Sequence, residues 1–321
     1  MTGQPNRFLL FNNGMIGNTL FNMPVAAWLK GAFPGCFVGM VVDRAGLDLV
    51  GADPNVDVFH TFNKKRDSLA RQFRLVCALR REQYDVSLHL RRGVRNEVLA
   101  RLAGVGLRAG YALRGSWQHL HVTVDEDMSV HRLASRAQLV EAALGRPVTL
   151  DRPRLHPSPE AEAEVRGLLA GTGMVAGTYL VVHPTGDSQG GIGWSLPVWA
   201  GVVARLSPSV PVFIVCMPHE RAAVEQAIPE GERVRYYTGS VAATAELVRR
   251  AGVFAGNDSG PAHLACAWGT LRLVVYLDDA ANFAKWRPAS DEGCLVVFQP
   301  AFTVETVVAG IQSLRNTARV E

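Results

Sequence analysis

A strand, a polar turn and a helix follow one another in residues 253–270, and a junction of this kind can bind an anion. An apolar run begins at Val253, and a turn with Asp258 and Ser259 follows it. Either of these two side chains suits the N-cap of a helix. Pro261 suits the first turn of that helix, because its missing N–H would have no partner there. The sequence therefore predicts a helix that begins at this turn.

The start of that helix would carry the chemistry. Its first N–H groups have no intrahelical partner and lie at the positive end of the helix dipole, so they attract phosphates above all. Gly260 lets a ligand approach the backbone closely, and His263 can donate a further hydrogen bond to the same anion. The alternative is an ordinary strand–helix junction without a ligand, and the residues of this stretch alone leave both interpretations open.

Length and composition indicate a well-packed protein of two domains. The chain has 321 residues, of which 48% are hydrophobic and 19% charged. It contains no run of apolar residues long enough to cross a membrane, and its first residues do not resemble a signal peptide. Five cysteines are scattered through mostly apolar runs, which is typical of reduced core residues. We expect a cytoplasmic protein.

The charge pattern favours small anionic ligands over nucleic acid. The formal net charge is only +4, and most of the basic residues are arginines, whose planar group suits phosphate and carboxylate. No basic stripe interleaved with aromatic residues is present, so we expect no nucleic-acid partner.

Strands alternate with helices along the whole chain, which predicts parallel sheets covered by helices. Three prolines within residues 150–159 interrupt this alternation, and the pattern then starts again. We therefore expect a first Rossmann-like domain over residues 1–158, a second over residues 159–302, and a final helix in residues 303–321 that packs back on the first domain.

The motif Asn-Asp-Ser-Gly-Pro-Ala-His-Leu-Ala-Cys-Ala-Trp-Gly-Thr at 257–270 resembles the signature of the ADP-heptose heptosyltransferases, glycosyltransferase family 9. Residues 183–196 resemble a second family segment, with Trp194 at the position of its tryptophan. The resemblance implies an α/β fold of the GT-B type, in which two Rossmann-like domains face each other across a cleft. It also implies that the second domain binds an ADP-sugar.

The resemblance assigns a role to several residues. Glu220 matches the position whose carboxylate binds the ribose hydroxyls, although it also suits the acidic start of a helix. Val241 matches an apolar side chain that packs on adenine. Thr185 and Gly186 belong to a glycine-rich segment that either presents N–H groups to phosphate or is a simple surface loop. The expected nucleotide site thus comprises Thr185, Gly186, Glu220, Val241, Asp258, Ser259, Gly260, Pro261 and His263.

Two positions depart from the family pattern and put its usual mechanism in doubt. The family places a catalytic aspartate after the first strand, whereas this chain has Asn18, whose amide cannot take up a proton. The family's phosphate-binding lysine is replaced by Ile192. The nucleotide-binding half of the pattern is otherwise largely intact.

Three accounts of the reaction stay open. In the first account, the acceptor needs little help from a base and Asn18 only orients it. In the second, another residue is the base. In the third, the protein has lost catalysis and kept binding. His89 is the first candidate base and Asp187 the second, although a hydrogen-bonded structural role is the more common one for a histidine such as His89. Arg91, Arg92 and Arg95 follow His89, where they would either form an acceptor wall that tolerates anions or lie in solvent at a helix start.

We expect no metal and no cofactor. Asp278 and Asp279 form an isolated acidic pair, and His119 and His121 give no metal geometry by themselves. Glycosyltransferases of this fold use a helix dipole where others use a cation.

The expected function is transfer of a sugar, in the first place a heptose, from an ADP-sugar with inversion. A small soluble natural-product intermediate is the favoured acceptor, and the core of lipopolysaccharide is the alternative. Association with a membrane is expected only if the acceptor is a lipid. Two further alternatives are a nucleotide-binding protein without transferase activity and a nucleotide-sugar epimerase.

Overall fold

The computed structural model describes residues 5–63, 66–186, 195–276 and 280–317. These residues form two compact units. The first unit contains residues up to Arg154 together with Ala284–Arg287, and the second contains Leu155–Phe283 and the residues from Pro288 onward. The division falls within the proline-containing segment that the sequence marks as a linker.

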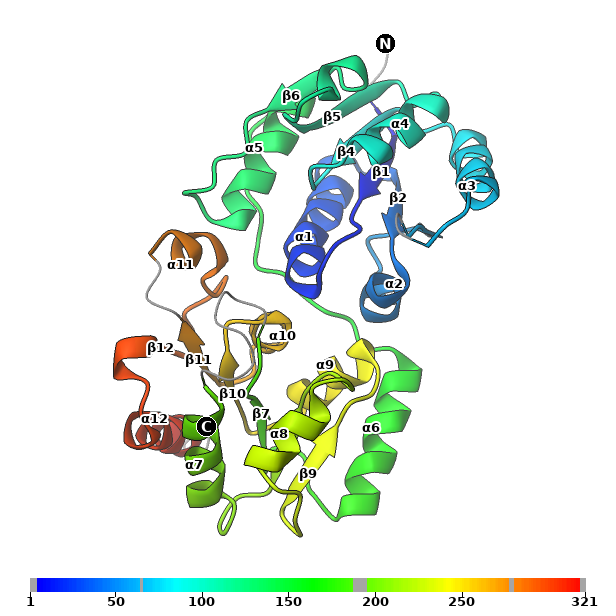
Figure 1. The fold of residues 1–321 in the computed structure, drawn as a ribbon. Helices are drawn as coiled ribbons and strands as arrows, with labels where there is room; N and C mark the ends of the chain where they lie inside the picture. The colour runs from blue at the N-terminus through cyan, green and yellow to red at the C-terminus, as the bar shows by residue number, and fades with distance from the viewer. Residues whose placement is uncertain (1–4, 64–65, 187–194, 277–279, 318–321) are drawn as a thin grey trace. The chain divides into compact units, whose positions relative to one another are not determined.

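The first unit is a parallel six-stranded sheet with helices packed against it (Figure 1). The strand order is β3-β2-β1-β4-β5-β6. Its elements are β1 (Arg7–Phe11), α1 (Ile16–Ala32), β2 (Phe37–Val42), α2 (Arg44–Val50), β3 (Val58–Thr61), α3 (Leu69–Arg81), β4 (Val86–His89), α4 (Val94–Leu102), β5 (Leu107–Tyr111), η1 (Ser116–Gln118), β6 (Val122–Val124) and α5 (Arg132–Leu144).

The second unit repeats the same plan (Figure 1). Its sheet has the order β12-β11-β10-β7-β8-β9, and all the pairs are parallel. Its elements are α6 (Pro159–Thr172), β7 (Leu180–His183), α7 (Leu196–Leu206), β8 (Val212–Val215), α8 (Arg221–Ala227), β9 (Val234–Tyr237), α9 (Val241–Arg249), β10 (Val253–Asn257), α10 (Gly260–Trp268), β11 (Arg272–Tyr276), α11 (Ala280–Trp286), β12 (Cys294–Phe298), η2 (Gln299–Ala301) and α12 (Val304–Thr317).

The order of the strands determines where a ligand can bind in each unit. In each unit the chain begins with a central strand, β1 or β7, and the next two strands extend the sheet to one edge. The fourth strand, β4 or β10, then pairs with the other side of that first strand. The reversal lies between β1 and β4 in the first sheet and between β7 and β10 in the second. In open parallel sheets, ligands bind at this reversal, beyond the carboxyl ends of the strands. Asn12 directly follows β1, His183 is the last residue of β7, and Pro184 follows it.

Local signals explain where several helices begin and end. The hydroxyls of Ser68, Ser158 and Ser240 each accept a hydrogen bond from the backbone N–H three residues later, which caps α3, α6 and α9. Gly173 and Gly269 end α6 and α10 in the left-handed conformation that glycine adopts without strain. Because these caps depend on neighbouring residues only, they can be read from the sequence.

The last helix differs from its expected position. The sequence predicts a final helix that packs on the first domain, but α12 belongs to the second unit. Its buried residues Val307, Ile311 and Leu314 join a core cluster with Trp199 of α7 and Leu273 of β11. The helix covers a face of the second sheet that would otherwise expose these apolar residues, and burial of that surface decides its position.

Candidate functional site

Asn257 ties three segments together at the reversal point of the second sheet. It is the last residue of β10 and is buried. Its side-chain N–H groups donate to the Pro184 carbonyl (3.0 Å) and to the Ser195 hydroxyl (2.8 Å), while its oxygen accepts from the Trp199 indole (3.0 Å). The Ser195 hydroxyl in turn donates to the Pro184 carbonyl over 2.7 Å. The two described ends of the glycine-rich segment are therefore both fixed to the end of β10.

The turn after Asn257 leads directly into α10, as the sequence predicts. Ser259 is the N-cap and Pro261 lies in the first turn. Unlike Ser158 and Ser240, Ser259 makes no capping bond with its side chain. Its Oγ is buried and has no hydrogen-bond partner among the described residues. A buried polar atom of this kind requires an explanation, and a ligand that accepts its hydrogen bond is one.

A histidine and a carboxylate lie beside this helix start. The Asp258 backbone N–H donates to the Val275 carbonyl over 2.8 Å, which continues the pairing of β10 beyond its last residue. Asp258 Oδ1 lies 4.0 Å from His263 Nε2 on the first turn of α10, and both side chains are largely buried. The structure thus brings Asp258, Ser259, Gly260, Pro261 and His263 together at one corner of the second unit.

Glu220 occupies a defined position at the same edge of the sheet. Its Oε2 accepts hydrogen bonds from the Thr185 hydroxyl (3.0 Å) and from the Met217 backbone N–H (2.8 Å). Glu220 precedes α8 without capping it through its side chain. Glu220 is almost fully buried, so little solvent reaches its carboxylate. Two of the sequence-predicted residues, Thr185 and Glu220, are therefore in direct contact.

The structure describes only some of the remaining residues that the sequence singles out. Val241 is the first residue of α9 and is half-buried, and Gly186 is the last described residue before the gap at 187–194. Asp187, Ile192 and Trp194 lie outside the described residues.

Asn18 lies at the reversal point of the first sheet. It belongs to the first turn of α1, which starts at Ile16 after the end of β1, and it is largely buried. Its Cβ lies 3.2 Å from the position that a Cβ on Gly14 would take, and the Arg91 side chain passes the same position. Asn18 therefore lies beyond the carboxyl end of β1, the edge at which open parallel sheets bind ligands.

His89 is a structural residue in this geometry, and we correct its candidacy as a base. Its ring is fully buried at the end of β4 and stacks on Phe11, with ring centroids 4.6 Å apart. Nε2 lies 3.2 Å from the Ser87 hydroxyl, whereas Nδ1 has no partner among the described residues. Burial, with a smaller contribution from Arg108, lowers the pKa of His89 to about 3. A ring enclosed in this way cannot reach an acceptor hydroxyl.

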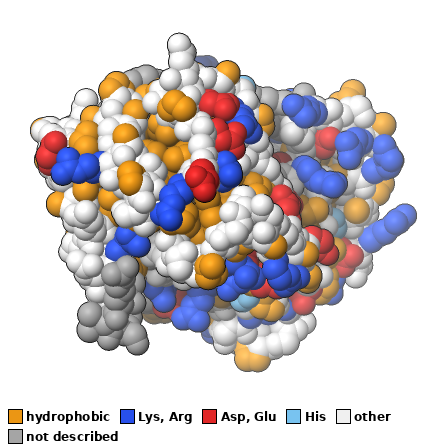
Figure 2. Space-filling model, turned by 90° about the horizontal axis from the view of Figure 1, so that it is seen from below, with side chains coloured by type: hydrophobic (Ala, Val, Ile, Leu, Met, Phe, Trp, Pro, Cys, Tyr) orange, Lys and Arg blue, Asp and Glu red, His pale blue; other side chains and the backbone are white. Residues whose placement is uncertain are grey.

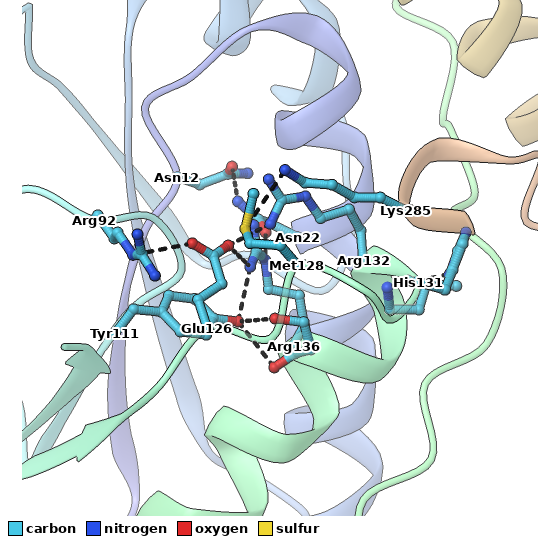
Figure 3. A network of polar contacts seen from close by, with 12 residues as sticks. Asn12, Asn22, Arg92, Tyr111, Glu126, Met128, His131, Arg132, Arg136 and Lys285 are labelled. Carbon is cyan, nitrogen blue, oxygen red and sulfur yellow. Dashed lines mark hydrogen bonds and ion pairs between the residues drawn. The ribbon is translucent and has the colours of Figure 1, made fainter. Parts of the chain in front are cut away.

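A polar network that the sequence does not suggest begins at Asn12, directly after β1 (Figure 3). The Asn12 oxygen accepts from the Asn22 amide (2.7 Å), and the Asn22 oxygen accepts from Arg136 Nε (2.7 Å). Arg136 also donates to the Tyr111 hydroxyl (2.7 Å), which donates to the Ser135 carbonyl (2.8 Å). The network joins β1, α1, β5 and α5 at the carboxyl edge of the first sheet.

Glu126 stands at the centre of a group of arginines beside this network (Figure 3). Its carboxylate lies 3.2 Å from Arg92 and 3.5 Å from Arg136, and it pairs closely with Arg132. Burial alone would raise the pKa of Glu126, but the guanidinium groups of Arg132 and Arg136 outweigh it and lower the pKa. Because three cations surround one anion, this edge of the first unit carries an excess of positive charge. The i, i+4 spacing of Arg132 and Arg136 was the available signal in the sequence.

No cluster of three His, Cys, Asp or Glu side chains occurs in the described residues, and Asp278 and Asp279 lie outside that part of the chain. His119 and His121 contact the arginines Arg101 and Arg108. On the face drawn in Figure 2, basic side chains occur in separate groups beside acidic ones. Among the described helices, none combines the length and the apolar composition of a membrane span.

A sequence model of glycosyltransferase family 9 (heptosyltransferase) matches residues 72–301, well over half of the chain. The chain belongs to glycosyltransferase family 9. It is an enzyme of the sugar-transferring class, and the match includes the whole corner around Ser259 and Glu220. No curated protein matches the sequence.

Several solved structures have the same fold as this chain. A family 9 glycosyltransferase from Veillonella parvula has a TM-score of 0.87 at 15% identity, with 99% of each chain covered. The E. coli ADP-heptose lipopolysaccharide heptosyltransferase II has a TM-score of 0.82 at 14% identity, over 98% of this chain and 99% of that one. The E. coli heptosyltransferase WaaC, solved with ADP, has a TM-score of 0.76 at 17% identity, over 96% and 99%. The fold of this family 9 member is therefore GT-B.

Proposed function

We propose that this family 9 enzyme transfers a sugar, in the first place a heptose, from an ADP-sugar to an acceptor with inversion at the anomeric carbon. The main support is the buried Ser259 hydroxyl without a partner at the start of α10. Structures of E. coli WaaC hold ADP and ADP-2-deoxy-2-fluoro heptose, which makes ADP-heptose the first donor to test here.

The donor's diphosphate would bind at the start of α10. The Ser259 hydroxyl would donate its free hydrogen bond to a phosphate oxygen, and the backbone N–H groups of this helix end would add further bonds. His263 lies on the first turn of the same helix. The Glu220 carboxylate, held by Thr185 and by the Met217 N–H, would accept hydrogen bonds from the ribose hydroxyls. Val241 would lie against the adenine ring.

The reaction would be a direct displacement. An acceptor oxygen or nitrogen attacks the anomeric carbon from the side opposite the diphosphate, and the bond between that carbon and the phosphate oxygen breaks. ADP leaves with the bonding electrons, and the acceptor loses its proton to a base or to water. The helix dipole of α10 would stabilise the charge that grows on the departing diphosphate.

Proton removal is the step in which this enzyme would differ from its family's pattern. Asn18 lies where the family has an aspartate, and its amide can hold an acceptor through hydrogen bonds but cannot take its proton. His89 is enclosed in the sheet. We therefore propose that Asn18 orients the acceptor, and that the acceptor either needs little base assistance or loses its proton to Asp187.

Two acceptor classes follow. A small soluble acceptor, such as a natural-product intermediate, suits the two departures from the family pattern. The core of lipopolysaccharide is the second candidate, because one helix of the first unit exposes apolar residues among arginines. Both classes share the same donor chemistry.

Nucleotide release measured by mass spectrometry tests the proposal. The protein is incubated with ADP-heptose, ADP-glucose and a UDP-sugar, with and without candidate acceptors. ADP release that requires an acceptor, together with a glycosylated product of inverted configuration, is the expected result. Tight ADP binding without release would instead support a binding protein. Donor isomerised in the absence of an acceptor would support an epimerase.

A further inference from the structure

Three exposed apolar side chains follow the carboxyl ends of strands in the first sheet. Met15, Leu113 and Met128 are 62%, 41% and 46% exposed. They come after β1, β5 and β6, respectively, and these strands run parallel in the sheet. With neighbouring strands about 4.8 Å apart, the three loops leave the sheet within roughly 15 Å of one another. Apolar side chains are therefore exposed at the edge where open parallel sheets bind ligands.

Two of these side chains are close in the chain to polar residues of the same edge. Met15 is the N-cap residue of α1, three residues before Asn18, and its carbonyl accepts a hydrogen bond from the Thr19 N–H over 3.0 Å. Met128 follows Glu126 by two residues, and its Sδ accepts a hydrogen bond from Lys285 Nζ over 3.6 Å (Figure 3). Lys285 belongs to the first unit as well. The methionines thus accompany both Asn18 and the arginine group around Glu126.

The polar side chains of the network at this edge bind mainly to one another. Asn12 and Asn22 are joined through their amides, and Arg136 contacts Asn22, the Tyr111 hydroxyl and the Glu126 carboxylate. A sugar acceptor carries several hydroxyls, and each one that is removed from water without a hydrogen-bond partner costs free energy. A network whose members already bind one another favours an acceptor with few polar groups.

Cations and aromatic rings are in contact beside Met128. The Arg132 guanidinium carbon lies 4.5 Å from the centroid of the Trp286 ring, and Lys285 Nζ lies 5.5 Å from the same centroid. Trp286 also packs on Phe21 of α1, with ring centroids 6.0 Å apart. Cations bind the faces of aromatic rings, and thioethers contact the rings favourably. Because Lys285 contacts both Trp286 and Met128, an aromatic ligand at Met128 would extend this cluster.

The asparagine at position 18 favours an aromatic alcohol for a separate reason. A sugar hydroxyl holds its proton about as tightly as water, whose pKa is about 16, and therefore needs a base. A phenol has a pKa of about 10, as in the tyrosine side chain. It loses its proton roughly 10⁶-fold more readily, because each pKa unit corresponds to a factor of ten. An amide that only orients the hydroxyl is then sufficient.

We propose that the acceptor is a phenol whose aromatic body binds at Met15, Leu113 and Met128 while Asn18 orients its hydroxyl. This inference rests on the proposed function. The phenolic oxygen forms a bond to the anomeric carbon, and the bond from that carbon to the diphosphate breaks. ADP leaves with the electron pair, and the phenolic proton passes to water. The product is an aryl glycoside.

Acceptor-dependent release of ADP tests the proposal with three probes. The full chain is incubated with ADP-heptose and with 2-naphthol, decahydro-2-naphthol or methyl glucoside. We expect release with 2-naphthol to be at least about tenfold faster than with decahydro-2-naphthol, which has the same carbon skeleton without the aromatic ring. Methyl glucoside should give no release. Across a series of substituted phenols, the pH at which the rate rises should follow the pKa of the acceptor.

Titration with 2-naphthol in the presence of ADP measures acceptor binding without turnover. The double variant Met15→Ser, Met128→Ser should weaken 2-naphthol binding about tenfold, because apolar contact is lost, and should keep its ADP affinity. Leu102 at the end of α4 is 56% exposed in the same unit, so Leu102→Ser is the matched control and should leave both affinities unchanged. Circular dichroism and ADP binding check that the double variant is folded.

The outcomes separate this proposal from the proposed transfer reaction. Binding of 2-naphthol that the double variant weakens, without any release of ADP, would support the aromatic site and contradict the transfer. Equal release with 2-naphthol and decahydro-2-naphthol, or release with methyl glucoside alone, would overturn the phenol and leave the transfer intact. Parent-like binding of 2-naphthol by the double variant would also overturn the proposal.

Discussion

The hydroxyl of Thr185 donates a hydrogen bond to the carboxylate of Glu220 over 3.0 Å, across a separation of 35 residues. This bond joins the segment after β7 to the start of α8 at the carboxyl edge of the second sheet. A second bond, from the Met217 backbone N–H to the same oxygen, fixes the carboxylate further. Glu220 is thus oriented before any ligand arrives, which lowers the entropy cost of binding.

Replacing Glu220 by glutamine should weaken ADP binding about tenfold, because hydrogen bonds from ribose hydroxyls to a charged oxygen are stronger than those to an amide. Isothermal titration with ADP and with 2′-deoxy-ADP measures the effect. The parent protein should prefer ADP, and Glu220→Gln should lose much of that preference. Glu225→Gln is the control, because Glu225 on α8 pairs with Arg221 at the surface. An unchanged preference in Glu220→Gln would contradict a role in ribose binding.

Two serines at helix starts provide a matched pair for the phosphate site. Ser158 caps α6 with a bond of 3.1 Å to the Ala161 N–H, whereas Ser259 makes no such bond at α10. Ser158→Ala should therefore cost about 1 kcal/mol of unfolding free energy without changing ADP affinity. Ser259→Ala should cost little stability but weaken ADP binding about fivefold to tenfold, because a hydrogen bond to a phosphate is lost.

Urea unfolding and ADP titration of both variants measure these two effects. If Ser259→Ala lost stability and kept its ADP affinity, the hydroxyl would serve the fold and the proposed phosphate site would be wrong.

Asn18→Asp restores the carboxylate that the family has at this position. We expect the rate of transfer to rise by roughly 10²-fold or more, since a general base contributes about 10²–10⁴-fold. The increase should appear as the pH is raised through the pKa of the new carboxylate, because only the ionised form accepts a proton. Asn96→Asp serves as control, because Asn96 lies in the first turn of α4 and its side chain contacts Asn13 over 2.9 Å. An unchanged rate in Asn18→Asp with intact ADP binding would show that proton removal is not limiting.

His89 should make stability depend on pH. Its pKa is lowered from 6.5 to about 3 by burial, so the unfolded chain binds a proton more readily than the native one. Its contribution is therefore complete above pH 6.5 and falls by about 1.4 kcal/mol for each pH unit below that, down to about pH 3. Unfolding by urea at pH 7 and pH 5 should show this loss in the parent protein and a smaller loss in His89→Asn. His219→Asn, at an exposed residue, should behave like the parent. A parent-like loss in His89→Asn would contradict the assignment.

The alternation of strands and helices could be predicted from the sequence, and so could the helix start after Asp258. Both depend on residues close together in the chain: an apolar run, an N-cap serine, a proline in the first turn and a glycine at the helix end. The motif around Ser259 could also be matched to a family, because its residues are consecutive. Asn18 could be placed for the same reason, since it follows the first strand directly.

Tertiary structure alone decided which distant residues meet. The Asn257 amide binds Pro184 and Ser195, and the Glu126 carboxylate pairs with Arg92, through contacts between residues more than 30 positions apart in the chain. The enclosure of His89 and the packing of α12 on the second sheet likewise depend on what lies opposite each residue. Local sequence determines the conformation of a segment, but which side chains are buried depends on how the apolar faces of all segments pack together. That packing exists only in the folded chain.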